Sequence, residues 1–211
     1  MYLPTHFQQT DTAVLHDLMR SHPLATLVTL APSGLNANHV PLHVCAEGAP
    51  LGTLRGHVAR ANPMWNDVRA DVQALAIFHG PQSYVSPNWY PTKSQTGRVV
   101  PTWNYVAVHA YGSLRVIDDA AWVRGLLQTL TVEHEAAEPK PWTMQDAPEE
   151  FVARMVASVV GIEIVITELL GKIKASQNQP SENRAGVVSA LRAQRSDDAQ
   201  AMAALVESAG T

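Results

Sequence analysis

The residues best suited to bind a ligand lie around Arg60. Arg60 stands two residues before Asn62-Pro63, a pair typical of the N-cap and first turn of a helix, here expected over Pro63–Ala70. Free backbone N–H groups, the helix dipole and the guanidinium would then face one point, which suits an anion. A surface arginine that holds no ligand explains the same spacing equally well.

A second candidate is the aromatic stretch from His79 to Arg115. Aromatic residues make up only 6% of the chain, yet this stretch contains Trp89, Trp103 and four tyrosines. Four prolines stiffen it, because each fixes one backbone angle and biases its predecessor toward extended geometry. A long, stiff, aromatic loop is typical of a binding site, although a packing loop over the end of a barrel is the alternative.

No catalytic group can be assigned from the sequence. The chain contains no P-loop, GxGxxG, HExxH, GxSxG or CxxC motif. Its histidines are scattered singly, and even His39 and His43 would lie about 13 Å apart on one extended strand, too far to share a metal. The single cysteine, Cys45, excludes an internal disulfide and is expected to be a buried structural thiol. Whether the protein is an enzyme therefore stays open, and no metal site is expected.

The elements that must position these residues are mostly strands. Their order, strands followed by helices and then a strand again, favours an antiparallel barrel with added helices, an α+β protein that is mainly β. Helices are expected to begin at Thr10 or Asp11, at Asp118 or Asp119, at Pro148, and at the caps Ser181 and Ser196. The expected strands are Leu24–Leu30, Leu35–Cys45, Gly52–Ala59, Gln73–His79, Thr102–Val116 and Gly161–Leu169.

The strand Thr102–Val116 alternates clearly. Its even positions, such as Val106 and Val108, are apolar, whereas its odd positions include Trp103, Tyr105 and His109. One face is therefore expected to pack on a core. The other presents an aromatic surface suited to a ligand or to a second subunit.

Composition narrows the class of protein. The 211 residues allow one large domain or two small ones, and only 16% of them are charged, which makes a homo-oligomer plausible. The net charge of −4 provides no general attraction to nucleic acid. No apolar run is long enough to span a membrane, and the amino terminus has no signal-peptide pattern, so a cytoplasmic protein with no membrane partner is expected.

Six blocks of the sequence resemble the PaiB family of FMN-binding split-barrel proteins. They come in the family's order and span nearly the whole chain. The blocks are MYLPTHF with Asp11, HVPL (His39–Leu42), GHVARANP (Gly56–Pro63), GPQSYVSPNWY (Gly80–Tyr90), VPTWNYVAVHAYG (Val100–Gly112) and KASQNQP (Lys174–Pro180).

The resemblance implies a homodimeric split β-barrel, similar to pyridoxamine phosphate oxidases and flavin reductases, with FMN between two subunits. Residues 1–170 would form the FMN-binding domain, with inserted helices at 119–159, and residues 171–211 a helical tail on the barrel or on the partner. By this similarity the flavin phosphate lies near His57 and Arg60. The remaining implied FMN contacts are Asn38 and His39 beside the ring, Trp103 and Asn104 on the facing wall, and Lys93, Lys174, Gln177 and Asn178 closing the pocket.

The resemblance also implies a negative regulator of transcription, linked in Bacillus to sporulation and degradative-enzyme genes. Direct contact with DNA has little support, because basic residues concentrate only in the tail, at Lys172, Lys174, Arg184, Arg192 and Arg195. A flavin-dependent oxidoreductase is the alternative. A haem-binding or haem-degrading protein, with His109 or His79 as axial ligand, is a further one.

Overall fold

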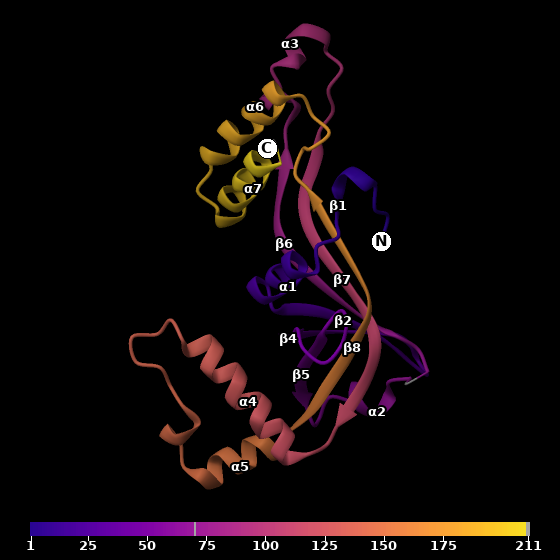
Figure 1. Ribbon diagram of the computed structural model, residues 1–211, viewed down its shortest axis with the longest axis vertical. Coiled ribbons are helices and arrows are strands. Elements are labelled where there is room, and N and C mark those ends of the chain that lie inside the picture. Colours follow the sequence, from indigo (N-terminus) through magenta and orange to yellow (C-terminus); the bar gives the residue numbers. More distant parts are fainter. Residues whose placement is uncertain (70, 210–211) are drawn as a thin grey trace. The chain divides into compact units, whose positions relative to one another are not determined.

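The structure is a computed structural model that describes residues 1–69 and 71–209. It divides into two compact units. Unit 1 comprises Met1–Ser21, His79–His109 and the chain from Leu170 onward, and unit 2 comprises His22–Phe78 and Ala110–Leu169. Three long strands contribute residues to both units: β6 (Ala74–Val85), β7 (Thr102–Ile117) and β8 (Val159–Lys174) (Figure 1).

Unit 2 is built on an antiparallel sheet that returns on itself. The sheet order is β3-β2-β6-β7-β8-β5-β4. Because β3 ends at Pro41 and β4 begins at His43, the two ends of this path are joined by Leu42 alone, which closes the sheet. The short strands of unit 2 are β2 (Leu24–Ala31), β3 (Gly34–Pro41), β4 (His43–Cys45) and β5 (Thr53–Ala59).

Side chains from alternating strand positions fill the interior of this barrel. In β2 every second residue from Ala25 to Ala31 is buried, which is the period of a strand with one face on a core. The strand β8 instead is buried continuously from Val160 to Ile164. Its outer face is covered as well, because the Trp122 ring lies directly against Gly161, where even a methyl group would collide with the indole.

A helical arm completes unit 2. It consists of α4 (Ala120–Glu135), the short helix η3 (Met144–Asp146) and α5 (Glu149–Ala157). Asp119 caps α4 by accepting a hydrogen bond from the Trp122 backbone N–H, as expected from the sequence. Val123, Val152 and Val156 form the buried centre where α4 and α5 pack.

Unit 1 surrounds a separate core. Val85, Val106 and Ala175 from the strand ends and the following segment pack against Val187 and Met202 of the carboxyl-terminal helices. Its helical and short elements are η1 (Thr5–Phe7), β1 (Gln8–Gln9), α1 (Thr12–Ser21), η2 (Pro87–Trp89), α3 (Thr92–Thr96), α6 (Ser181–Arg192) and α7 (Asp197–Ser208).

Two local expectations around the candidate sites are wrong. The helix expected over Pro63–Ala70 is a single turn, α2 (Met64–Asp67), since Val68 is extended, and Ala70 lies outside the described residues. Pro63 takes the N-cap position, and the Asn62 side chain accepts from the Met64 backbone N–H instead. One turn has too few aligned peptides for the helix dipole that the anion site requires.

Other boundaries also differ. Ser181 is the first residue of α6 rather than its cap, with Pro180 before it and no side-chain cap. The expected strand Leu35–Cys45 is split at Leu42, and β6 continues to Val85, into the expected loop. Pairing of β6 with β2 covers only Leu75–Ile77. A proline at position 81, beyond that pairing, can therefore lie in a strand without losing a ladder bond to β2.

Candidate functional site

The ten residues expected to bind the cofactor are divided between the two units. Unit 2 contains Asn38, His39, His57 and Arg60. Unit 1 contains Lys93, Trp103, Asn104, Lys174, Gln177 and Asn178.

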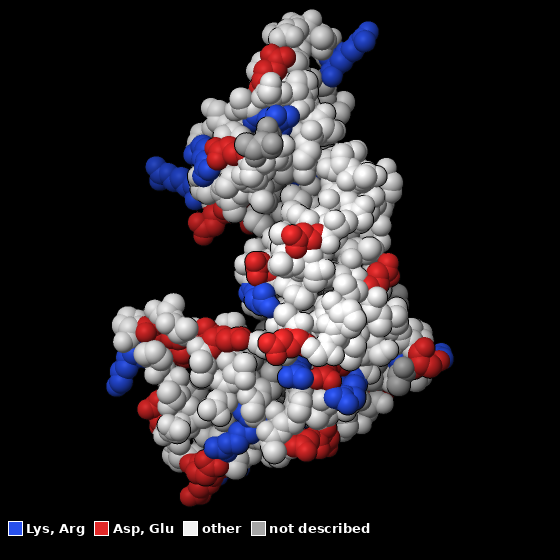
Figure 2. Space-filling model, in the orientation of Figure 1, with Lys and Arg blue, Asp and Glu red and all other residues white. Residues whose placement is uncertain are grey.

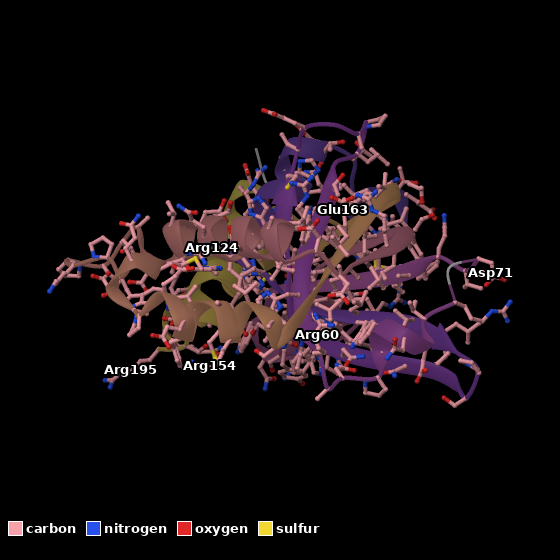
Figure 3. All side chains as sticks on the ribbon, turned by 90° about the horizontal axis from the view of Figure 1, so that it is seen from below. Arg60, Asp71, Arg124, Arg154, Glu163 and Arg195 are labelled. Atoms are coloured by element: carbon pink, nitrogen blue, oxygen red, sulfur yellow. The ribbon has the colours of Figure 1, made fainter. Side chains whose placement is uncertain are left out.

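Arg60 is held by contacts within unit 2 (Figure 3). Its Nη1 and Nη2 donate to the two Asp118 carboxylate oxygens at 3.0 and 2.6 Å, and its Nε donates to the Ala157 carbonyl at 2.8 Å. The hydrogen bonds from this guanidinium hold the pKa of Asp118 below its ordinary value. Arg60 therefore ties the end of β5 to the segments after β7 and α5, and a phosphate bound there would share it with Asp118.

The other three residues of this group have different surroundings. Asn38 accepts a hydrogen bond from the Asn62 amide at 2.8 Å, and the exposed His39 is 3.2 Å from the Thr26 hydroxyl. His57 Nδ1 is buried without a hydrogen-bond partner in the part of the chain that the structure describes. Burial lowers the pKa of His57, so the ring is neutral near pH 7 and keeps one free nitrogen for a ligand.

A pocket within unit 1 has a volume of about 410 Å³. Three of the expected residues, Asn104, Lys174 and Asn178, line it. The other lining residues are Phe7, Tyr90, Thr92, Arg98, Val99, Val100, Thr102, Ser176, Gln179, Pro180 and Asn183. This lining contains two cations and no carboxylate, which favours an anionic ligand.

Two buried polar groups of this pocket lack partners. Asn104 is completely buried, and its Nδ2 donates to the Ser176 hydroxyl at 2.9 Å. Its Oδ1 and the Tyr90 hydroxyl have no hydrogen-bond partner among residues 1–69 and 71–209. Whichever way the amide is turned, one end pairs with Ser176 and the other remains free. Because unpaired buried polar groups are costly, a ligand that pairs with them would be stabilised.

Lys174 is one of the two cations that line this pocket. Its Nζ donates to the Thr102 hydroxyl at 2.6 Å and lies 5.9 Å from the centre of the Phe7 ring. Neither neighbour carries a negative charge. The ammonium is thus oriented at the pocket while its charge stays available for an anion.

The segment after β8 supports the pocket. Ser176 has a left-handed backbone, with φ of 60°, and this conformation is uncommon outside glycine and concentrates at functional sites. The Gln177 side chain accepts from the Ala175 N–H at 2.7 Å and donates to the Ile173 carbonyl at 2.6 Å. Gln177 therefore holds the turn rather than lining the pocket.

Besides Gln177, two more of the expected unit 1 residues lie outside the lining of this pocket. Lys93 donates to Asn88 Oδ1 at 2.6 Å, and the half-exposed Trp103 donates to Gln82 Oε1 at 3.2 Å. Sequence reasoning missed Tyr90 and Ser176, although both lie within quoted blocks, GPQSYVSPNWY and KASQNQP. Nothing in the order of the residues showed which of those side chains would be left unpaired.

Comparison with known proteins identifies the family of this chain. Residues 1–168 match the model of the family described as "Putative FMN-binding domain". The chain belongs to this family.

Two relatives extend over nearly the whole chain. An uncharacterized protein of Emericella nidulans is 31% identical, over 100% of this chain and 98% of that protein. The Bacillus subtilis protein named "Protease synthase and sporulation protein PAI 2" is 27% identical, over 98% of this chain and 97% of that protein. Among solved structures, the flavocytochrome Anf3 of Azotobacter vinelandii superposes with a TM-score of 0.58 at 12% identity, over 85% of this chain and 75% of that chain.

Several expectations are confirmed by these findings. The fold is an antiparallel α+β split barrel with flanking helices, the resemblance to the PaiB family holds, and the cofactor of the family is FMN. Within the described residues no helix is long and apolar enough to cross a membrane. The homodimer, the boundary at residue 170 and the ten contact residues remain predictions.

Proposed function

We propose that this flavin-binding split-barrel protein holds FMN with the polar groups of the unit 1 pocket and acts as a negative regulator of transcription through its flavin or another small molecule. The observation that carries the binding site is the pair of unpaired buried groups, Asn104 Oδ1 and the Tyr90 hydroxyl, in a pocket lined by cations and no carboxylate.

The chemistry of FMN fits this pocket. The flavin ring has one N–H group and two carbonyls at its polar edge, and the molecule carries a phosphate. An amide such as that of Asn104 can pair with either kind of ring group. Burial raises the pKa of Tyr90, so its hydroxyl stays protonated and can donate. When bound, FMN would supply electron transfer, while Lys174 and Arg98 would hold its negative charge.

The other expected contacts remain part of the proposal. Asn38, His39, His57 and Arg60 would meet the ring and phosphate in a homodimer, as the family resemblance implies. The free Nδ1 of His57 supports this for unit 2. Lys93, Trp103 and Asn178 would border the flavin in the same assembly, and Gln177 would contribute by holding the turn after β8.

The binding proposal is tested by titrating FMN into the purified protein and following the flavin fluorescence. Asn104→Leu removes the hydrogen-bonding amide at similar volume and should weaken binding roughly 3- to 10-fold, the effect of one hydrogen bond. Gln194→Ala, an exposed amide on the same unit, is the matched control. An Asn104→Leu variant that stays folded by circular dichroism and binds FMN as well as the wild type contradicts the proposed site.

The regulatory role is supported by the name of the Bacillus subtilis relative, which refers to protease synthesis and sporulation. Direct DNA binding has little physical support. Among the basic residues of the tail, Lys172 is buried and Arg192 pairs with Glu207, so neither presents an exposed, unpaired charge to DNA. On the face shown in Figure 2, cations and anions are interspersed. Regulation through the flavin or a partner protein therefore fits better than a basic DNA-binding surface.

An oxidoreductase is the second candidate. It is supported by the two cations of the pocket, Lys174 and Arg98, which would stabilise the negative charge that a flavin gains on reduction. A haem protein is the third. His79 and His109 both belong to unit 1, and burial first, then the charge of the amino terminus and of His79, lower the pKa of His109. Oxidation of a nicotinamide cofactor by the FMN-loaded protein would favour the second candidate, and a Soret band on addition of haem the third.

A further inference from the structure

A second pocket, of about 320 Å³, lies within unit 2 beside α4. One wall is a single face of this helix, because Trp122, Gly125, Leu126 and Thr129 follow helical spacing. The other wall is formed by His43 and Arg55, which are directly opposite each other on β4 and β5. None of these residues belongs to the site proposed for FMN.

Arg55 brings an incompletely used guanidinium to this pocket. Its Nε donates to Glu163 Oε2 at 2.8 Å, and the group lies 5.9 Å from the centre of the Trp122 ring. Among the hydrogen bonds of the described residues, the one that Arg55 donates comes from Nε, and its terminal Nη1 and Nη2 donate none. A planar guanidinium with two free amino groups is the group that binds a carboxylate through two parallel hydrogen bonds.

The carboxylates near Arg55 and His43 favour a singly charged ligand over a doubly charged one. Glu163 is a nearly buried carboxylate, 7% exposed, and it also accepts from Arg115 Nη2 at 2.6 Å (Figure 3). Two guanidinium groups therefore share the Glu163 carboxylate, and Glu133 adds a second negative charge beside His43. These two carboxylates would repel a phosphate dianion more strongly than a monoanion, so a carboxylate ligand fits better.

His43 adds a second polar group with a fixed orientation. Its Nδ1 lies 2.8 Å from Glu133 Oε2 on α4. This bond holds the ring and leaves Nε2 as its other hydrogen-bonding atom. The His43 side chain is mostly buried, at 18% exposure, so a ligand that reaches it is largely removed from water.

The helix leaves this space open at a cost to itself. Gly125 lies in the middle of α4, where glycine is about 1 kcal/mol less favourable than alanine. A methyl group added there would meet nothing within 4 Å. The rest of the wall is apolar, with Leu126 and the Trp122 ring, which is fixed by its contact with Gly161.

We propose that this pocket binds a small carboxylic acid with an apolar or aromatic body. The carboxylate pairs with Nη1 and Nη2 of Arg55. The apolar body lies between Trp122 and Leu126 in the space above Gly125. The volume is at the lower end of the range for small-molecule sites, which limits the ligand to one ring or a short chain.

Isothermal titration of benzoate into the full-length, FMN-loaded protein tests this proposal. Benzoate should bind saturably with one site per chain, and the neutral isostere benzamide should bind at least 10-fold more weakly. Inorganic phosphate should also bind at least 10-fold more weakly than benzoate. Equal binding of benzoate and benzamide, or tighter binding of phosphate, overturns the proposal.

Three variants localise the binding. Arg55→Met removes the guanidinium and Gly125→Leu fills the pocket, and each should weaken benzoate binding at least 10-fold. Arg115→Met is the matched control, since it removes the other arginine of Glu163 but does not line the pocket, and it should change affinity less than 3-fold. Full affinity in Gly125→Leu, or an equal loss in Arg115→Met, contradicts the assigned site.

A measurement on the wild type covers the case in which a variant does not fold. Among the five tryptophan indole N–H resonances, that of Trp122 should shift most with benzoate. If benzoate shifts a different indole, the pocket is not the site. If FMN instead displaces benzoate competitively, the pocket belongs to the flavin and the proposal of a separate acid fails, whereas the proposal of FMN binding stands.

Discussion

Cations in the two units are balanced in different ways. In unit 2, Arg60 pairs with Asp118, Arg124 with Glu149, and both Arg55 and Arg115 with Glu163. In the unit 1 pocket, Lys174 faces a hydroxyl and an aromatic ring, and the neighbouring Lys172 faces a carbonyl and two such rings. Carboxylate partners neutralise charge and fix geometry, whereas hydroxyls and rings fix geometry alone. Lys174 and Lys172 therefore retain more attraction for an anionic ligand than these arginines of unit 2 do.

The largest effect is expected from reversing the charge at Lys174. Lys174→Glu would place a carboxylate among groups suited to an anion and should weaken FMN binding on the order of 10- to 150-fold, since a charged hydrogen bond contributes about 1.5–3 kcal/mol. Fluorescence titration measures this. Lys140→Glu, in the loop after α4, is the control and should bind FMN normally. If Lys174→Glu binds FMN with unchanged affinity, the charge of Lys174 does not attract the ligand, and the inferred contrast between the two units is wrong.

A smaller effect, on stability, is expected in unit 2. Glu163→Gln removes the carboxylate shared by Arg55 and Arg115, whose side chains are 42% and 70% exposed. Because water partly replaces the lost partners, the free energy of unfolding should fall by about 1–2 kcal/mol rather than by the full cost of breaking a buried ion pair. Urea denaturation measures the change. The exposed Glu168→Gln is the control, and equal stability of both variants would show that Glu163 is not structural.

The smallest effect concerns Asp118 and pH. The guanidinium of Arg60 lowers the pKa of this carboxyl, so the pairing stabilises the fold above the pKa of Asp118 in the unfolded chain and is lost as pH falls through the lowered value. The stability difference between wild type and Asp118→Asn should therefore be largest near pH 7 and shrink toward pH 3. Urea denaturation at several pH values measures it.

The same variant tests the role of Arg60. If Arg60 binds the flavin phosphate, Asp118→Asn should strengthen FMN binding, because it releases the guanidinium. Unchanged FMN affinity would indicate that Arg60 is purely structural. A stability difference that stays constant with pH would show that the ion pair contributes nothing measurable.

Much of the fold follows from local patterns. The alternation in β7, with Val106 and Val108 buried and Trp103 exposed, appears in the structure as the sequence predicts. The cap at Asp119 and the family itself were also predicted from the sequence. The one-turn helix after Asn62 was not, because the Asn62 side chain satisfies the Met64 N–H without a longer helix forming.

The candidate sites were less predictable than the strands. The blocks identified Asn104 and Lys174, and both line the pocket. They did not single out Tyr90 or Ser176, which also line it. An unpaired group is defined by everything that surrounds it, so no single stretch of sequence contains that information.

The sequence by itself determined which residues alternate, which segments turn and which family the chain belongs to, since these depend on neighbours along the chain. Only the tertiary structure decided that Asn104 meets Ser176, 72 residues away, and that Arg60 meets Asp118, 58 residues away. Such pairings depend on strand register and on the packing of distant elements, and they set which charges are neutralised and which remain available to a ligand.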